Sequence, residues 1–275
     1  MKIRIMVITG VVIIVALLTL AILNTIRDKD IFLSKQESGG QFTSWTEILN
    51  QATKNEAEGN YLKAKSLYEK LVNNFANVSQ VGDWQKKTWD LNIKILFSPT
   101  ITEGSILYEI KSGDSLVKIA KKFNTTAEFI KKSNGLLSDK IIAGKKLKVW
   151  TEPFNIVVDK SQNILILKSD DEIIKIYIVS TGINNSTPKG NFKLVTKLVN
   201  PVWYKDGKAI PPDSPDNILG SRWMGFDLVD YGIHGTTEPE TLGQQITQGC
   251  VRMSNSDVEE LFTIVPTGTE VTVVD

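Results

Sequence analysis

The chain has 275 residues, with 32 lysines and arginines against 31 aspartates and glutamates, and a net charge of +1. This near balance gives no electrostatic reason to expect binding to nucleic acid. The chain has one cysteine and one histidine, which excludes an internal disulfide and any multi-cysteine metal site. We therefore expect no metal and no cofactor. The length is enough for two or three small domains, so we expect a multidomain protein.

Residues 5–23 contain no charged side chain, and at ~1.5 Å per residue they nearly span the hydrocarbon core of a membrane. Lys2 and Arg4 precede this run and, by the positive-inside rule, place the N-terminus in the cytoplasm. We expect residues 1–27 to form an uncleaved signal anchor, a single transmembrane helix. The rest of the chain would then lie outside the cytoplasm, on the periplasmic or cell-wall side. The alternative, a cleaved signal peptide, lacks a small-x-small cleavage site and also predicts export.

Residues 28–41 are polar and include Ser-Gly-Gly at 38–40, which predicts a linker. Residues 42–100 predict an α-helical spacer, because apolar residues recur there at helical spacing. Within it, the segment 57–64 resembles part of a tetratricopeptide repeat (TPR), over about one repeat, whereas stable arrays need about three. We therefore expect a small helical hairpin that spaces the rest of the chain from the membrane. A protein partner of this TPR-like segment stays open, because one repeat cannot bury both of its faces.

Residues 105–150 predict a small α/β module in the order strand, helix, helix, strand. A Gly-Asp-Ser turn at 113–115 opens the first helix, and Asn134-Gly135 is typical of the end of the second. The module resembles the LysM family over its full length. This resemblance implies binding to glycans that contain N-acetylglucosamine, such as peptidoglycan or chitin. The residues that it places nearest the glycan are Gly113, Asp114, Ser115, Asn134 and Gly135.

Residues 154–275 predict a mostly-β domain, and we expect it to form a β-sandwich. Apolar residues alternate between turns at 159–163 and 169–172, which indicates a meander of antiparallel strands. Near the end, Ser256-Asp257-Val258-Glu259 fits a capping box that opens a short helix. A domain of this length can bury a core of its own.

Cys250 and His234 are the chain's only cysteine and only histidine, 16 residues apart in the sequence. A cysteine nucleophile acts as a thiolate and needs a base to form it, so the chain has one candidate for each role. The alternative is a buried cysteine and a hydrogen-bonded structural histidine, since lone cysteines usually behave as small hydrophobic residues. Gly235 and Gly249 favour catalysis, because glycine lets the backbone approach a substrate closely.

Three motifs then carry a resemblance to the catalytic domain of YkuD-type L,D-transpeptidases, which covers 154–275. They are Thr187-Pro188-Lys189-Gly190, the run from Asn217 to Trp223, and Thr247-Gln248-Gly249-Cys250-Val251-Arg252-Met253. The resemblance implies attack on the peptide bond after the third stem residue of peptidoglycan, with loss of terminal D-alanine and a thioester on Cys250. An amine would then resolve the thioester in cross-linking, or water in an L,D-carboxypeptidase.

The resemblance also assigns roles to the neighbours of Cys250. His234 would be the general base and acid, the Gly235 carbonyl would orient it, and backbone N–H groups of Gly249 and Cys250 would hold the oxyanion. Arg252 either binds substrate or forms a structural ion pair. Tyr231 and Trp223 either line the cleft or belong to the core. The family commonly has a second histidine where this chain has Gln248, which keeps a catalytically idle wall-binding scaffold as an alternative.

Overall fold

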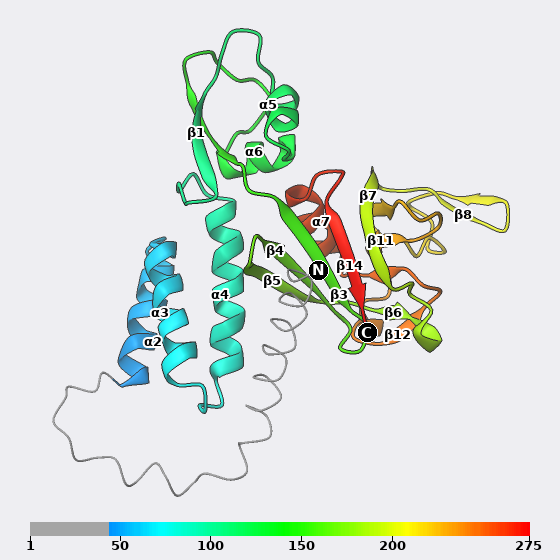
Figure 1. Cartoon of the computed structure of the whole chain (residues 1–275), viewed down its shortest axis with the longest axis horizontal. Helices are drawn as coiled ribbons and strands as arrows, with labels where there is room; N and C mark the ends of the chain where they lie inside the picture. The colour runs from blue at the N-terminus through cyan, green and yellow to red at the C-terminus, as the bar shows by residue number, and fades with distance from the viewer. Residues whose placement is uncertain (1–43) are drawn as a thin grey trace, which may run out of the picture. The chain divides into compact units, whose positions relative to one another are not determined.

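The computed structural model describes residues 44–275 (Figure 1). The predicted signal anchor at 1–27 and the predicted linker at 28–41 lie outside the described residues. The part that is described divides into two compact units, with the division between Leu91 and Asn92. Within residues 44–275, no helix combines the length and the apolar character needed to cross a bilayer.

The first unit is helical, as the sequence predicts. It contains α2 (Trp45–Ala57), α3 (Tyr61–Asn74) and the first part of α4 (Val81–Leu96), which continues into the second unit. Ser44 opens α2 with a capping box: its side chain accepts from the Glu47 N–H, and the Glu47 carboxylate accepts from the Ser44 N–H. The buried apolar face consists of Ile48, Ala52, Ala64, Tyr68, Leu71, Trp84 and Leu91. The resemblance to a tetratricopeptide repeat stays a prediction.

The second unit begins with the end of α4 and continues with the predicted strand–helix–helix–strand module. Its elements are β1 (Ser105–Glu109), α5 (Leu116–Lys122), α6 (Ala127–Ser133) and β2 (Lys146–Trp150). The two strands pair in an antiparallel hairpin. Ser115 caps α5 by accepting from the Lys118 N–H, and Thr126 caps α6 by accepting from the Phe129 N–H. The predicted order of elements is therefore confirmed.

The remainder of the second unit is built on one eight-stranded sheet, in the order β13-β11-β10-β7-β14-β3-β4-β5. The predicted meander forms one side of this sheet, where β3, β4 and β5 are antiparallel neighbours. The C-terminal strand β14 lies parallel to β3 (Figure 1). The sheet strands are β3 (Phe154–Asp159), β4 (Ile164–Ser169), β5 (Glu172–Ile178), β7 (Gly190–Val199), β10 (Arg222–Phe226), β11 (Gly232–His234), β13 (Val251–Arg252) and β14 (Glu270–Val274).

Short elements complete this domain. Strands β6 (Thr181–Gly182) and β12 (Gln245–Thr247) pair in parallel, and β8 (Trp203–Lys205) and β9 (Lys208–Ile210) form a hairpin. Two turns of 3₁₀-helix span Ile183–Asn185 and Pro239–Thr241. A single α-helix, α7 (Asn255–Ile264), follows β13 directly.

The two halves of this sheet share β7, and the predicted β-sandwich stays a prediction. Residues 190–193 of β7 pair with β14, whereas residues 194–199 pair with β10. A ten-residue strand is long enough to serve two sets of neighbours in turn. The predicted capping box is wrong by two residues: Ser254, not Ser256, caps α7 by accepting from the Asp257 N–H. A serine followed three residues later by an acid occurs twice in succession here, and the earlier one caps the helix.

The module at 105–150 shares a hydrophobic core with the sheet domain. Phe129 of α6 and Trp150 of β2 both pack on Phe154 of β3, with ring centroids 6.1 and 5.5 Å apart. The Thr126 hydroxyl donates to the carbonyl of Thr263 near the end of α7. These contacts join the two domains directly, so no free linker separates them.

Lys148 of β2 ties the module to the C-terminal end of α4. Its side chain is 1% exposed, and its ammonium donates to the carbonyl oxygens of Ile95, Leu96 and Ser98 at 2.8, 3.3 and 2.9 Å. The last carbonyls of a helix have no partner within the helix, so Lys148 supplies one. Burial lowers the pKa of Lys148 to about 8, while the three carbonyls favour its charged form.

We expect Lys148→Met to remove one hydrogen bond from each of these carbonyls and to destabilise the second unit by about 1–3 kcal/mol, or about 3–8 °C in Tm. Lys146→Met is the matched control, because Lys146 lies two residues earlier on the same strand and is exposed. Thermal unfolding followed by circular dichroism measures both. Equal Tm values for the two variants would show that the contacts of Lys148 do not stabilise the fold.

Candidate active site

Parallel pairing of two short strands brings Cys250 and His234 together. Strand β11 pairs with β13 so that Ile233 lies opposite Val251 and His234 lies opposite Arg252. Ile233 and Val251 are fully buried and fix this register in the core. Cys250 directly precedes β13, and this register places it next to the start of β11. The predicted pair is therefore assembled at one edge of the sheet.

His234 is 2% exposed, and its Nδ1 lies 2.6 Å from the carbonyl oxygen of Gly235. A carbonyl oxygen can only accept, so Nδ1 carries the ring proton and Nε2 has a free lone pair. The Trp223 ring stacks on the imidazole, with centroids 6.0 Å apart and planes at 21°. The carbonyl and the indole together fix both the tautomer and the plane of the ring.

Cys250 is half-buried, and its thiol donates to the carbonyl oxygen of Asp230 at 3.4 Å. Burial raises the pKa of the Cys250 thiol to about 11, against an opposing contribution from the Gly232 backbone. Burial also lowers the pKa of His234 to about 4, against an opposing contribution from the Gly235 carbonyl. The resting pair at neutral pH is thus a thiol and a neutral imidazole.

These two shifts predict how alkylation of Cys250 depends on pH. A raised thiol pKa favours the protonated form, so the thiolate fraction and the rate with iodoacetamide should rise tenfold per pH unit until pH approaches 11. The product is read by intact mass, since the chain has one cysteine. N-acetylcysteine is the control, with a rate that levels off above about pH 8.5. A plateau between pH 5 and 8 would instead indicate a thiolate–imidazolium pair.

The Thr247 hydroxyl organises the backbone on either side of the nucleophile. Its Oγ1 donates to the Cys250 carbonyl at 2.6 Å and accepts from the Gly249 N–H at 3.2 Å. Gly249 has a φ of +131°, and a Cβ there would lie 2.6 Å from Cε1 of Tyr231. The Gly249 N–H predicted to hold the oxyanion is therefore engaged by Thr247. The Cys250 N–H has no hydrogen-bond partner among residues 44–275.

Two family models match the chain. The model of the L,D-transpeptidase catalytic domain covers residues 153–273, and the LysM model covers residues 108–150. A protein described as an L,D-transpeptidase, YkuD of Bacillus licheniformis, is 32% identical over 61% of this chain and 98% of its own length. The chain belongs to the YkuD family of L,D-transpeptidases.

Two Bacillus subtilis proteins extend this comparison. YkuD is 31% identical over 61% of this chain and 98% of its own length. YqjB is 40% identical over 44% of this chain and 70% of its own length. Both are described as L,D-transpeptidases. A LysM domain joined to an L,D-transpeptidase domain indicates peptidoglycan binding.

The Arg252 side chain of this L,D-transpeptidase domain forms hydrogen bonds and an ion pair with other residues of the same chain. Its Nη1 donates to Glu238 Oε2 and to Thr241 Oγ1, both at 2.9 Å, and its side chain is 7% exposed. The Arg252 and Ser180 backbones exchange two hydrogen bonds of 2.8 Å. The structure therefore shows the structural ion pair, which holds the loop between the histidine and the cysteine. Contact between Arg252 and substrate stays a prediction.

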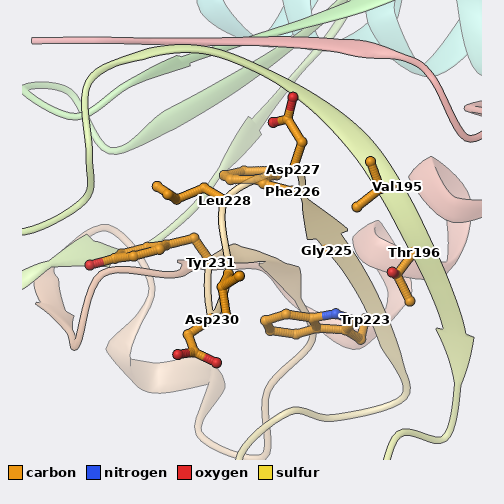
Figure 2. Close-up of a pocket in the computed structure, with 10 residues that line it drawn as sticks. Val195, Thr196, Trp223, Gly225, Phe226, Asp227, Leu228, Asp230 and Tyr231 are labelled. Carbon is orange, nitrogen blue, oxygen red and sulfur yellow. The ribbon is translucent and has the colours of Figure 1, made fainter.

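A hollow of about 350 Å³ lies between β7 and the loop that precedes β11. Figure 2 shows Val195 and Thr196 of β7 on one side of it and the loop residues Leu228, Asp230 and Tyr231 on the other. Trp223, which stacks on His234, also lines it. Trp223 and Tyr231 both line this hollow, and Tyr231 also packs against the hydrophobic core, so their contact with substrate stays a prediction. Neither Cys250 nor His234 is itself in the lining.

The predicted glycan-binding residues all lie at turns of the LysM domain. Asp114 accepts from the Lys111 N–H and from the Tyr108 hydroxyl, and these contacts hold the pKa of Asp114 below its usual range. Ser115 caps α5. Gly113 and Gly135 have φ of +82° and +62°, which the turns require. Asn134, the fifth predicted glycan-binding residue, also has a structural role.

Asn134 joins the second helix of the LysM domain to its last strand. Its amide exchanges hydrogen bonds with the Lys148 backbone at 2.7 and 2.8 Å, and it donates to Ile130 O at 2.7 Å. The structure thus gives Asp114, Ser115 and Asn134 local structural roles. Their contact with glycan stays a prediction.

Two residues of the site were not predicted from the sequence. Thr247 lies in the last motif without a predicted role, although a threonine hydroxyl commonly bonds to the backbone a few residues on. Asn255 carries no local signal in the sequence, and its amide bonds to the backbones of Ser221 and Thr236. Among residues 44–275, no group of three or more histidine, cysteine, aspartate or glutamate side chains is arranged to hold a metal ion.

Proposed function

We propose that this protein is an exported, membrane-anchored L,D-transpeptidase that acts on peptidoglycan stem tetrapeptides through a thioester on Cys250. The observation that carries the proposal is the 2.6 Å contact between His234 Nδ1 and the Gly235 carbonyl oxygen. It leaves Nε2 with a free lone pair, available as the base for the thiol of Cys250. The LysM domain supports peptidoglycan as the substrate, because it would hold the glycan strand to which the stem is attached.

In the first half of the reaction, Cys250 Sγ attacks the carbonyl carbon after the third stem residue while His234 Nε2 takes the thiol proton. A carbon–sulfur bond forms, and the carbonyl oxygen becomes an oxyanion that the Cys250 N–H can stabilise. The carbon–nitrogen bond then breaks, and His234 returns the proton to the leaving amine of D-alanine. The product is a thioester between Cys250 and the shortened stem.

In the second half, an amine of a neighbouring stem or of an anchored protein attacks the thioester. His234 takes a proton from that amine, the carbon–sulfur bond breaks, and His234 passes the proton to the sulfur, which restores the thiol of Cys250. The new amide bond is the cross-link. If water attacks instead, the product is a free tripeptide stem and the enzyme is an L,D-carboxypeptidase.

Mass spectrometry of muropeptides tests the proposal. The full chain is incubated with disaccharide-tetrapeptide, and the products are separated and weighed. Loss of D-alanine with formation of a dimer supports a transpeptidase, and a tripeptide alone supports a carboxypeptidase. No loss of D-alanine under varied conditions would contradict both readings and favour the idle scaffold that Gln248 keeps as an alternative.

The anchor requires its own measurement. Residues 5–23 carry no charge and follow Lys2 and Arg4, so the mature protein in membranes should begin near Met1. N-terminal sequencing of the membrane fraction measures this directly. A mature protein that starts after residue 24 would instead indicate a cleaved signal peptide.

A further inference from the structure

Asn255 contacts the backbone next to the catalytic histidine, although it lies on α7, a different element. Its Oδ1 accepts from the Ser221 N–H at 3.0 Å and from the Thr236 N–H at 3.2 Å, and its Nδ2 donates to the Thr236 carbonyl at 2.9 Å. All three hydrogen bonds go to backbone groups. The side-chain amide of Asn255 thus binds the backbone N–H and C=O of Thr236 and the N–H of Ser221, the residue before β10.

The peptide between Gly235 and Thr236 links Asn255 to His234. The N–H of this peptide belongs to Thr236 and donates to Asn255 Oδ1. Its C=O belongs to Gly235 and accepts from His234 Nδ1. A peptide unit is planar, so its N–H and C=O turn together. Holding the N–H therefore fixes the direction in which the carbonyl points at the imidazole.

The side-chain oxygen of Asn255 occupies the space beside Gly235 where another residue would have its Cβ. A Cβ on Gly235 would lie 2.2 Å from Asn255 Oδ1, and its next contacts would be at 3.1 Å or more. Gly220, on the other side, would place a Cβ 2.3 Å from the same oxygen. Gly235 therefore leaves room for this amide, whereas a Cβ on Gly220 would also meet the backbone atoms Thr236 N at 2.4 Å and Gly235 C at 2.7 Å. Asn255 is itself exposed to solvent at the start of α7, where Ser254 provides the helix cap.

We propose that Asn255 is a positioning residue that locks the Gly235–Thr236 peptide and thereby sets the tautomer of His234. This inference rests on the proposed role of His234 as the base, but its structural part does not depend on activity. Without Asn255 the peptide can rotate, the carbonyl leaves Nδ1, and the ring proton is free to move to Nε2. A proton on Nε2 would remove the lone pair that takes the thiol proton.

Nitrogen NMR of the full chain tests this directly, because the chain has a single histidine and ¹⁵N-histidine labelling reports on it alone. The protein is purified without a histidine tag. The wild type should show the Nδ1–H tautomer and a pKa near 4. Asn255→Ala should show a mixture with the Nε2–H tautomer. Asn255→Asp keeps an acceptor for the Thr236 N–H, so it should retain the Nδ1–H tautomer.

Ser254→Ala is the matched control for a general weakening of α7. It removes the cap of the helix, which accepts from the Asp257 N–H, but leaves the contacts of Asn255 in place. It should retain the Nδ1–H tautomer. An unchanged tautomer in Asn255→Ala, or the same tautomer mixture in Ser254→Ala, would overturn the proposal.

A mutant cycle between Gly235 and Asn255 gives a second measurement. Gly235→Ala alone should lower Tm, because the new methyl group overlaps Asn255 Oδ1. Adding Asn255→Ala removes that overlap, so the double variant should recover part of the loss. A double variant that is less stable than Gly235→Ala alone would contradict the spatial match.

Kinetics connect the tautomer to the proposed reaction. Asn255→Ala should lower kcat for D-alanine release about tenfold or more with little change in KM, since a misplaced base affects the chemical step. Asn255→Asp should stay within about threefold of the wild type. Equal kcat in Asn255→Ala and wild type would overturn the positioning role. If the wild type releases no D-alanine, the proposed function fails, and the NMR result still decides the role of Asn255.

Discussion

Cys250→Ser should reduce D-alanine release from a stem tetrapeptide by at least about 10³-fold, the largest loss expected of any single substitution in this domain. Serine keeps the size and position of the side chain but replaces a thiol by a much weaker acid. His234, whose pKa burial lowers to about 4, is too weak a base to ionise a hydroxyl group. Release of D-alanine, coupled to D-amino-acid oxidase, measures the rate.

The variant should fold normally, because the thiol makes one 3.4 Å hydrogen bond to the Asp230 carbonyl that a hydroxyl can replace. Circular dichroism and binding to insoluble peptidoglycan serve as controls. Both should match the wild type, since the LysM domain is unchanged. A Cys250→Ser variant that retains activity within about tenfold would mean that another residue is the nucleophile.

His234→Gln should lower kcat about 10²–10⁴-fold, the range typical of a lost general base. Glutamine keeps an amide that can donate to the Gly235 carbonyl, but it cannot take a proton near neutral pH. The residual acylation should rise steeply with pH, because it then depends on ionisation of a thiol whose pKa is about 11. Single-turnover acylation rates across pH 5–10 measure this change.

The wild-type profile should be flatter over the same range and fall only at low pH. The pKa of His234 is lowered to about 4 by burial, so the neutral base is present above that pH and is lost as pH falls through it. Trp223→Phe is the control, since it keeps an aromatic ring beside the imidazole. A His234→Gln variant with the wild-type rate and profile would show that the base is another group.

The predicted elements came from local signals, which is why most of them are confirmed. Alternating apolar residues and turn residues identified β3, β4 and β5, and the Gly-Asp-Ser turn with its caps identified the LysM helices. The pair of Cys250 and His234 could be predicted because each occurs once in the chain. The role of the Gly235 carbonyl came from the family resemblance, and the 2.6 Å contact confirms its position.

The features that were missed depend on contacts between distant segments. The sequence does not show that β7 would pair with β14 along one half and with β10 along the other. Asn255 reads locally as one of several polar residues at a helix start, and its function appears only when Thr236 is beside it. Lys148 likewise reads as one of many exposed lysines, yet it is buried against the end of α4.

Acylation by a carbapenem tests the central claim, that Cys250 is the nucleophile of this L,D-transpeptidase domain. The full chain is mixed with the carbapenem, and intact mass is followed by peptide mapping. We predict one adduct per chain, on the peptide that contains Cys250, and none in Cys250→Ser. An adduct on any other residue, or an unmodified wild-type protein, would contradict the account.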